Sequence, residues 1–326
     1  MKGIDFGALG TERRNPRSMD LDRMSTVAIL RAINTEDRRV PVAVGRQIPR
    51  IAQAVDAVVR AIRAGGRVLY VGAGTSGRVG LLDALEWPPT FGVSPDMVKV
   101  IIAGGAQATI GSAAPAEDDR EGGGAKIAAA FAGPKDVVIG IAASGVTPFV
   151  LGAVEEARRR GCTIVGLTNV RGSPLARAAD VAIVPDVGPE VLTGSTRMKA
   201  GTSQKLVLNM ISTTAMVRLG KTYTNLMVDM QATNRKLAAR AHRMVMQATG
   251  VDAEAAARLL DEAGGSVKVA IVRGLTGVPP AAAVRLLDEA DGHVREAVRA
   301  AGTRPRRAKT TGGNHKTPRR TRAPRR

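Results

Sequence analysis

Short apolar runs alternate with helical segments between about residues 67 and 186. The runs are Arg67–Val71, Met97–Ala103, Asp136–Ala142, Thr163–Leu167 and Val181–Val184. They are continuously apolar, which is typical of strands buried on both faces. Helical segments separate them, most clearly Pro148–Arg160, which ends in three arginines before Gly161. The pattern therefore predicts an α/β fold, a three-layer doubly wound parallel sheet with helices on both faces.

Helical patterns flank this region on both sides. Asp20–Ile33 and Val42–Ala64 precede it, and Met198–Leu219 follows it as one long predicted helix. Between about 237 and 300 the chain is rich in Ala and Leu, and Arg258–Ala263 recurs 27 residues later as Arg285–Ala290. Two copies are too few for a solenoid, so we expect a small helical domain there. The predicted divisions are an N-terminal helical arm (1–40), a ligand-binding α/β domain (41–236), a helical cap domain (237–302) and a tail (303–326).

The composition supports a folded chain with an unusual end. Of 326 residues, 44% are hydrophobic and 24% charged, which is enough to build a core. The formal net charge is +19, but Thr303–Arg326 holds eight Arg, two Lys and no acid, and so accounts for +10 of it. We expect this tail to be disordered and to bind polyanions weakly. With only seven aromatic side chains in the whole chain, a general nucleic-acid-binding role is disfavoured.

The cysteine and histidine content and the apolar stretches of the chain bear on its location and its cofactors. One cysteine, Cys162, excludes a disulfide scaffold and fits a reducing compartment. Three histidines, all late in the chain, disfavour a histidine-built metal site, and we expect no metal and no cofactor. The N-terminus has no apolar run typical of a signal peptide, and Ser144–Pro148 interrupts the longest uncharged stretch, Val137–Val154. We therefore expect a soluble, cytoplasmic protein without membrane contact.

A glycine- and hydroxyl-rich turn follows the first predicted strand. Gly72–Arg78 opens a helix, where free backbone N–H groups attract anions. The spacing departs from a dinucleotide fingerprint, because the last glycine is misplaced and no isolated acid follows a second strand. Thr75 and Ser76 suit a compact terminal phosphate better. We therefore expect Gly74, Thr75, Ser76 and Gly77 to bind a phosphate, the alternative being a plain glycine-rich turn.

A second hydroxyl-rich turn, Ala142–Pro148, follows the third strand. Ser144 or Thr147 alone would be interpreted as a simple helix N-cap. Ligands of parallel sheets bind at the carboxyl ends of the strands, so both turns should meet at one crevice. One phosphate could then contact both turns, with Ser144, Gly145 and Thr147 on the second side.

Three further segments carry candidate chemistry. Glu86 precedes Pro88-Pro89, which end its helix, and is a candidate general acid, although an exposed glutamate is the simpler interpretation. Glu117 begins the acidic run Glu117–Glu121, and such runs are usually solvated loops. The segment Glu190–Lys199 leads into the long helix, where its hydroxyls and cations could bind an anion, although Arg197 and Lys199 could equally form surface ion pairs. From this segment we expect Glu190, Ser195 and Lys199 to bind the substrate.

Together these segments resemble the N-acetylmuramic acid 6-phosphate etherases, bacterial enzymes built on the sugar isomerase (SIS) fold. The resemblance spans about residues 11–300. Its most specific pieces are Gly72–Arg78, Glu86–Thr90, Ala116–Gly123 and Glu190–Lys205. The chain departs from the family pattern at Val146, where many members carry Arg, and at Trp87, where a smaller residue is common. The basic tail lies outside the resemblance.

The resemblance implies an SIS domain, a homodimer, and cleavage of N-acetylmuramic acid 6-phosphate to N-acetylglucosamine 6-phosphate and D-lactate during cell-wall sugar recycling. It implies Glu86 as the acid at the ether oxygen and Glu117 as the base at C2. Thr75, Ser76, Ser144 and Thr147 correspond to the phosphate-binding hydroxyls. Two alternatives remain: a non-catalytic sugar-phosphate-binding regulatory SIS protein, which would need neither glutamate, and an aldose–ketose sugar phosphate isomerase, which would need no acid at C3.

Overall fold

A sheet of five parallel strands forms the centre of the computed structural model, which describes residues 7, 9–111, 114–230 and 235–303. The strands are β1 (Val68–Gly72), β2 (Val98–Ile102), β3 (Val137–Ile141), β4 (Thr163–Leu167) and β5 (Val181–Ile183). Their order is β2-β1-β3-β4-β5, with Val68 of β1 level with Val98 of β2 and Val137 of β3. Each strand lies in a predicted apolar run, or one residue beyond it. The predicted doubly wound parallel sheet is confirmed.

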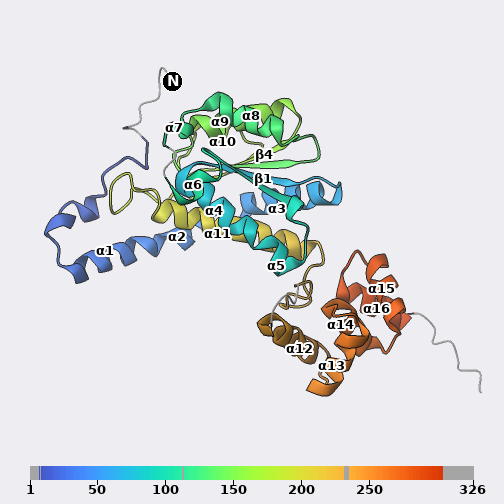
Figure 1. Ribbon diagram of the computed structural model, residues 1–326. Coiled ribbons are helices and arrows are strands. Elements are labelled where there is room, and N and C mark those ends of the chain that lie inside the picture. The colour runs from blue at the N-terminus through green and yellow to red at the C-terminus, as the bar shows by residue number, and fades with distance from the viewer. Residues whose placement is uncertain (1–6, 8, 112–113, 231–234, 304–326) are drawn as a thin grey trace, which may run out of the picture.

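Helices cover both faces of the sheet (Figure 1). One layer consists of α3 (Ile48–Arg63), α4 (Gly74–Leu85) and α11 (Lys199–Arg218), and the other of α8 (Arg120–Ala129), α9 (Pro148–Arg159) and α10 (Pro174–Ala178). Successive strand residues enter opposite cores: Tyr70 packs in the cluster below α3 and α11, whereas Leu69 and Val71 pack in the cluster with α9. This double burial explains why the strands are continuously apolar.

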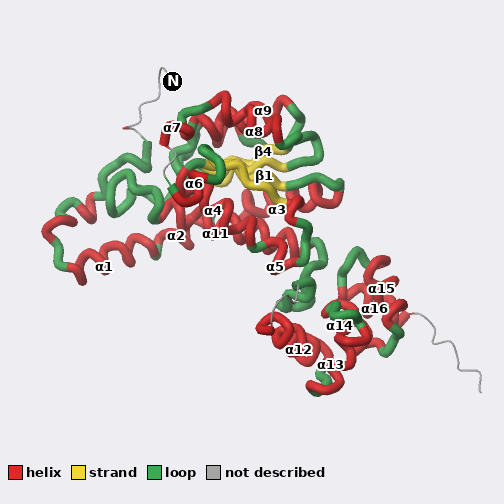
Figure 2. Tube along the Cα trace, viewed as in Figure 1, coloured by secondary structure: helices red, strands yellow, loops and turns green. Residues whose placement is uncertain are grey.

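The N-terminal helices differ in their bounds from the sequence prediction. The first, α1 (Thr26–Asp37), starts at Thr26 because the Ser25 side chain caps it by accepting from the Ala28 N–H. The predicted helix Val42–Ala64 is two helices, α2 (Arg39–Gly45) and α3, separated at Gln47, whose side chain accepts from the Val184 N–H of the sheet. Figure 2 shows α1 projecting from the body, and Glu36 is its one buried residue.

Short elements connect strands and helices around the sheet. They are α5 (Trp87–Phe91), α6 (Gln107–Ile110), α7 (Ala114–Glu117) and 3₁₀ turns at Pro16–Ser18, Leu21–Arg23 and Pro95–Met97. Two of them matter for function. The α5 helix follows α4 directly, and α7 lies between β2 and α8, at the carboxyl edge of the sheet.

The C-terminal region is helical and has its own apolar core. It contains α12 (Arg235–Thr249), α13 (Ala253–Glu262), α14 (Val267–Thr276), α15 (Pro280–Glu289) and α16 (Val294–Thr303). The sequence repeat is a repeated helix pair, because α13–α14 and α15–α16 start 27 residues apart. The predicted domain boundaries stay predictions, and the basic tail from residue 304 lies outside the described residues.

Among the helices that the structure describes, none is by itself long and apolar enough to span a membrane. The bent pair α14 and α15 meets the length and composition criteria only when its two helices are taken together.

Candidate active site

The site lies at the point where the order of the strands reverses. The chain leaves β1 toward β2 on one side, and leaves β3 toward β4 on the other, so the connections after β1 and β3 diverge and leave a crevice between them. These connections lead into α4 and α9. The N-termini of two helices therefore face one crevice, where their free N–H groups favour an anion.

A pocket of about 240 Å³ occupies this crevice. Six of the predicted site residues line it: Gly74, Thr75, Ser76, Glu117, Ser144 and Thr147. The rest of the lining is Glu12, Ala73, Ile141, Ala142, Ala143 and Thr196. Among these described lining residues there is no Lys or Arg, so hydroxyls and backbone N–H groups are the donors available to an anion.

The start of α4 is shaped by its glycines. Gly74 has a φ of +50°, a conformation that side chains disfavour. A Cβ on Gly72 would lie 2.6 Å from the Gly77 nitrogen, and one on Gly77 would lie 2.9 Å from the Ile102 side chain. Gly77 therefore allows the helix to start close to the strand, and does not line the pocket. Thr75, which is half-buried, and Ser76, which is buried, lie in this first turn and line the pocket.

In the second turn too, a glycine shapes the backbone while hydroxyl-bearing residues line the pocket. Gly145 has a φ of +70°, and a Cβ there would lie 2.2 Å from the Ser173 hydroxyl, so it sets the turn from behind the pocket. Val146 is buried and does not line the pocket. Thr147 is the residue before α9, but its side chain makes no cap hydrogen bond. Its hydroxyl instead donates to the Glu117 carboxylate over 3.2 Å.

Glu117, at the end of α7, is thereby part of the pocket. In the rest of its acidic run, Asp119 caps α8 by accepting from the Gly122 N–H at 2.8 Å, and Asp118 and Glu121 are exposed. The acidic segment is thus not simply a solvated loop. It directs one carboxylate toward the hydroxyl-bearing helix starts.

The structure does not bring Glu190 and Lys199 into the pocket. Glu190 is buried and accepts from the backbone N–H groups of Lys199 and Ala200 at the start of α11. Burial raises its pKa, although these two N–H groups oppose the rise. The Lys199 side chain is fully buried and donates to Glu36 at 2.5 Å and to the Pro189 carbonyl at 2.7 Å. Both side chains hold the loop before α11 in place.

Ser195 also lies outside the pocket lining, whereas its neighbour Thr196 lies within it. Glu12, a second carboxylate of the pocket, is likewise missing from the sequence prediction. The segment that carries it is anchored to the loop before α11, because Asn15 donates to the Pro189 carbonyl at 3.1 Å and Ser18 to the Val191 carbonyl at 2.7 Å. The sequence signal was Thr11–Pro16, one of the stretches that resemble the etherases, which names no role for Glu12.

Glu86 lies at the opposite end of α4 from the pocket and is exposed. Its neighbour Trp87 does not cover it. The indole is buried in the core and donates to the Asp83 carboxylate at 3.0 Å. Within one chain, therefore, the two predicted catalytic glutamates are not brought together.

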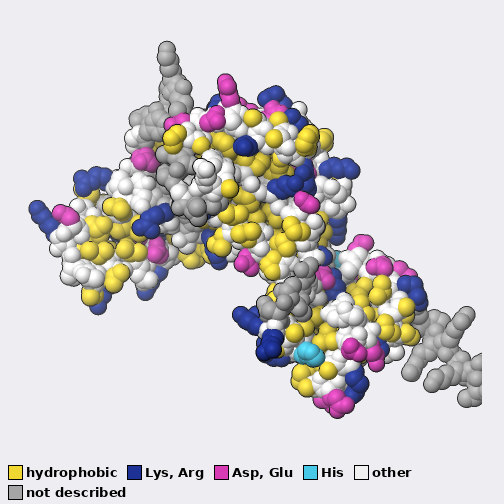
Figure 3. All heavy atoms as spheres, in the orientation of Figure 1, with side chains coloured by type: hydrophobic (Ala, Val, Ile, Leu, Met, Phe, Trp, Pro, Cys, Tyr) yellow, Lys and Arg dark blue, Asp and Glu magenta, His cyan; other side chains and the backbone are white. Residues whose placement is uncertain are grey.

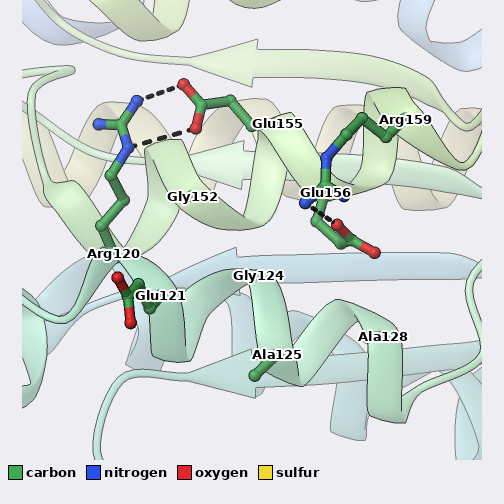
Figure 4. A pocket seen from close by; sticks show the side chains of 9 residues that line it. All are labelled: Arg120, Glu121, Gly124, Ala125, Ala128, Gly152, Glu155, Glu156 and Arg159. Carbon is green, nitrogen blue, oxygen red and sulfur yellow. Dashed lines mark hydrogen bonds and ion pairs between the residues drawn. The ribbon is translucent and has the colours of Figure 1, made fainter.

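A second hollow, of about 440 Å³, lies between α8 and α9 (Figure 4). Both of its arginines form ion pairs with glutamates of the lining, Arg120 with Glu155 and Arg159 with Glu156. It is lined by residues of α8 and α9 rather than by the turns that follow β1 and β3, and its two arginines are already paired. The pocket at the crevice is the candidate site. Across the described part of the chain, no cluster of three or more His, Cys, Asp or Glu is placed to hold a metal ion.

A parallel sheet with a hydroxyl-lined pocket at its reversal point is the arrangement of the sugar isomerase class, and family comparison agrees. The glucokinase regulatory protein N-terminal SIS domain matches residues 50–158, and the SIS domain matches residues 123–214. Among solved structures, a phosphoheptose isomerase from Neisseria gonorrhoeae is similar with a TM-score of 0.47 and 18% identity, over 59% of this chain and 98% of that one.

Curated relatives identify the family within this class. An N-acetylmuramic acid 6-phosphate etherase from Symbiobacterium thermophilum is 60% identical over 269 residues, which is 82% of this chain and 89% of the relative. A second, from Rubrobacter xylanophilus, is 56% identical over 82% of this chain and 89% of the relative. The chain belongs to the N-acetylmuramic acid 6-phosphate etherase family.

Proposed function

We propose that the protein is a carbon–oxygen lyase that cleaves the D-lactyl ether of N-acetylmuramic acid 6-phosphate. The products are N-acetylglucosamine 6-phosphate and D-lactate, formed in the recycling of cell-wall amino sugars. The observation that carries the proposal is the Glu117 carboxylate in the same pocket as the hydroxyls of two helix starts. The family membership supplies the substrate.

The 6-phosphate binds at the two helix starts. Thr75 and Ser76 offer hydroxyls and backbone N–H groups at the first turn of α4, and Ser144 offers a hydroxyl beside the start of α9. Both helices direct the positive end of their dipole at this point. The phosphate charge can thus be compensated without a lysine or arginine in the lining.

The reaction needs two carboxyl groups in opposite protonation states. Opening of the sugar ring exposes an aldehyde at C1, which acidifies the proton on C2. A carboxylate removes that proton, and a protonated carboxyl group delivers a proton to the ether oxygen as the bond to C3 breaks. Lactate leaves, and water then adds to the double bond between C2 and C3. Overall, one water is consumed, and the bond from C3 to the lactyl oxygen is replaced by a bond from C3 to the oxygen of water.

We assign Glu117 as the base at C2, because it shares the pocket with the phosphate donors and the Thr147 hydroxyl orients it. Glu86 is assigned as the acid at the ether oxygen. Gly77 and Gly145 act indirectly, by allowing the two turns, and Glu190 and Lys199 by holding the loop that brings Thr196 to the pocket.

A homodimer in the cytoplasm is part of the proposal. The cytoplasm is supported by the single cysteine, Cys162, which is free and buried and therefore forms no disulfide, as is typical of a reducing compartment. The dimer is supported by the apolar side chains that α1 and α4 leave exposed.

Incubation with N-acetylmuramic acid 6-phosphate and an assay for D-lactate tests the proposal. Lactate release is expected, and in ¹⁸O-labelled water the label should appear at C3 of the amino sugar product. An isomerase would change an aldose phosphate to a ketose phosphate without lactate, and a sensor would bind the sugar phosphate without turnover. Either result would overturn the etherase function.

A further inference from the structure

The pocket contains a carboxylate that the proposed mechanism does not use. Glu12 lines it together with Glu117. In the mechanism, Glu117 removes the proton from C2 and Glu86 protonates the ether oxygen, so Glu12 has no proton to move. A carboxylate within hydrogen-bond reach of a bound substrate can serve as a general acid or base. Its place in the pocket therefore calls for a step of the reaction that it could serve.

The two carboxylates reach the pocket from different layers of the fold. Glu117 lies on the side of α9, because it accepts from the Thr147 hydroxyl just before that helix. Glu12 lies on the side of α11, because a Cβ on Gly194, in the loop before α11, would lie 3.3 Å from the Glu12 Oε2. The helices α9 and α11 cover opposite faces of the sheet (Figure 1). A sugar in the pocket therefore meets carboxylates from two sides.

The Glu12 carboxylate is held in place by its own segment. Thr11 is buried, and its hydroxyl donates to the Glu12 Oε1 at 3.1 Å. Asn15 is also buried and ties the segment to the loop before α11 through the Pro189 carbonyl. A carboxylate offers about four lone-pair sites, so the bond from Thr11 leaves it able to accept from a sugar hydroxyl. A group fixed in this way is oriented before the substrate arrives.

The reaction includes a proton transfer to which no residue has been assigned. The cyclic sugar is a hemiacetal, and the aldehyde that acidifies C2 appears only when the bond between C1 and the ring oxygen O5 breaks. A proton must then leave the hydroxyl oxygen O1, and a proton must reach O5. Because this step precedes removal of the C2 proton, it needs a group that is not already occupied at C2.

Histidine is the commonest general acid and base, but no histidine is placed for this step. Among the described residues, His242 lies in α12 and His293 lies just before α16. Figure 3 shows histidine, in cyan, over the C-terminal helices on the visible face. No histidine is among the described residues that line the pocket. Glu12 is the carboxylate of this lining that remains once Glu117 is assigned to C2.

We propose that Glu12 catalyses the opening of the sugar ring, an inference that rests on the proposed etherase function. Its carboxylate takes the proton of the O1 hydroxyl. The double bond between C1 and O1 forms as the bond between C1 and O5 breaks, and the protonated Glu12 gives its proton to O5. One proton has then moved from O1 to O5, and Glu12 is again a carboxylate. Both oxygens are bonded to C1, so one carboxylate can serve both.

A sugar phosphate without the lactyl ether isolates this step. The two anomers of N-acetylglucosamine 6-phosphate interconvert through the open aldehyde, and exchange between their C1 proton signals in NMR measures the rate. The wild-type protein should accelerate the interconversion. Glu12→Gln should lower that acceleration by about 10²–10⁴-fold, as loss of a general base does, and lactate release from the substrate should fall with it. Glutamine is of the same size and keeps one accepting oxygen, so calorimetry should show that the sugar phosphate still binds.

Two matched variants separate ring opening from the later steps. Glu117→Gln should lose lactate release but keep the interconversion of the anomers, because removal of the C2 proton follows ring opening. Asp22→Asn changes an exposed carboxylate of the same N-terminal region that does not line the pocket, and should keep both activities. Glu12→Gln and Glu117→Gln therefore both lack lactate release and differ in the interconversion alone.

Three results would overturn the assignment. The first is a wild-type protein that does not accelerate the interconversion, and the second is a Glu12→Gln protein that keeps the interconversion or the lactate release of the wild type. The third is loss of the interconversion together with loss of sugar phosphate binding, which would make Glu12 a binding group only. A wild-type protein that releases no lactate from N-acetylmuramic acid 6-phosphate would instead overturn the proposed function, and this is measured in a separate assay.

Discussion

The Thr147 hydroxyl donates to the Glu117 carboxylate over 3.2 Å, and this bond joins two segments that follow different strands. Thr147 immediately precedes α9 after β3, and Glu117 ends α7 after β2. A hydroxyl at a helix start commonly caps that helix, but here it orients a carboxylate across the crevice. Phosphate donors and a proton acceptor are thereby held in one pocket.

Removal of the phosphate hydroxyls should weaken substrate binding. Ser76→Ala and Ser144→Ala each remove a hydrogen bond to a charged group, which contributes on the order of 1.5–3 kcal/mol. The KM for the sugar phosphate should rise by roughly tenfold to a hundredfold, measured by steady-state lactate release. Ser266→Ala serves as the control, since Ser266 lies at the start of a helix of the C-terminal region, α14, and does not line the pocket. An unchanged KM in both pocket variants would show that the phosphate does not bind at these two hydroxyls.

Glu12 should contribute to binding of the sugar. Its carboxylate lines the pocket and accepts from the Thr11 hydroxyl at 3.1 Å, so it is available to a sugar hydroxyl or to the acetamido N–H. Glu12→Ala should raise KM by roughly tenfold, as expected for loss of a charge-assisted hydrogen bond. A variant with unchanged KM and turnover would show that Glu12 does not contact the substrate.

Lys199 should be required for stability rather than for substrate contact. Its substitution by Met leaves Glu36 without its buried partner and should lower the free energy of unfolding by about 3 kcal/mol, because Arg17 and Arg39 still reach Glu36. Lys205→Met, at an exposed position of the same helix, should change it little. Urea unfolding measures both. If the Lys199→Met protein were as stable as wild type but had a raised KM, Lys199 would contact the substrate instead of stabilising the fold.

The same ion pair predicts a loss of stability in acid. Burial by itself raises the pKa of Glu36, but the hydrogen bond and charge of Lys199, together with Arg17 and Arg39, lower it from 4.5 to about 2. A carboxyl with a depressed pKa stabilises the fold fully above pH 4.5, and the stabilisation is lost as the pH falls toward 2. Its size is on the order of 3 kcal/mol.

The free energy of unfolding, measured at several pH values between 5 and 2, should therefore fall. A Glu36→Gln, Lys199→Met double variant removes both charges and should show a shallower fall over the same range. Equal slopes for the two proteins would assign the acid sensitivity to other carboxyl groups.

The sequence is enough to predict the sheet and the two hydroxyl-bearing turns at its edge, because each follows from a simple physical rule. Strands buried on both faces must be continuously apolar, and the carboxyl ends of parallel strands must lie at one edge, so the sequence alone is enough to pair Ser76 with Ser144. What local pattern cannot show is a partner far along the chain. Lys199 at a helix start resembles an anion ligand, and only the fold reveals Glu36, 163 residues earlier, as its partner. The separation of Glu86 from the pocket follows likewise from the uninterrupted length of α4.

The final prediction separates proton removal from departure of lactate. If Glu117 is the base at C2, Glu117→Gln should abolish exchange of the C2 hydrogen with deuterated water as well as lactate release. Glu86→Gln should lose lactate release by about 10²–10⁴-fold but keep the exchange, since the carboxylate that removes the C2 proton is intact. Glu121→Gln, in the same acidic run and outside the crevice pocket, should keep both. NMR of the substrate recovered from deuterated water measures the exchange. If Glu117→Gln retained it, the base would be another carboxylate, and Glu12 is the one that shares the pocket.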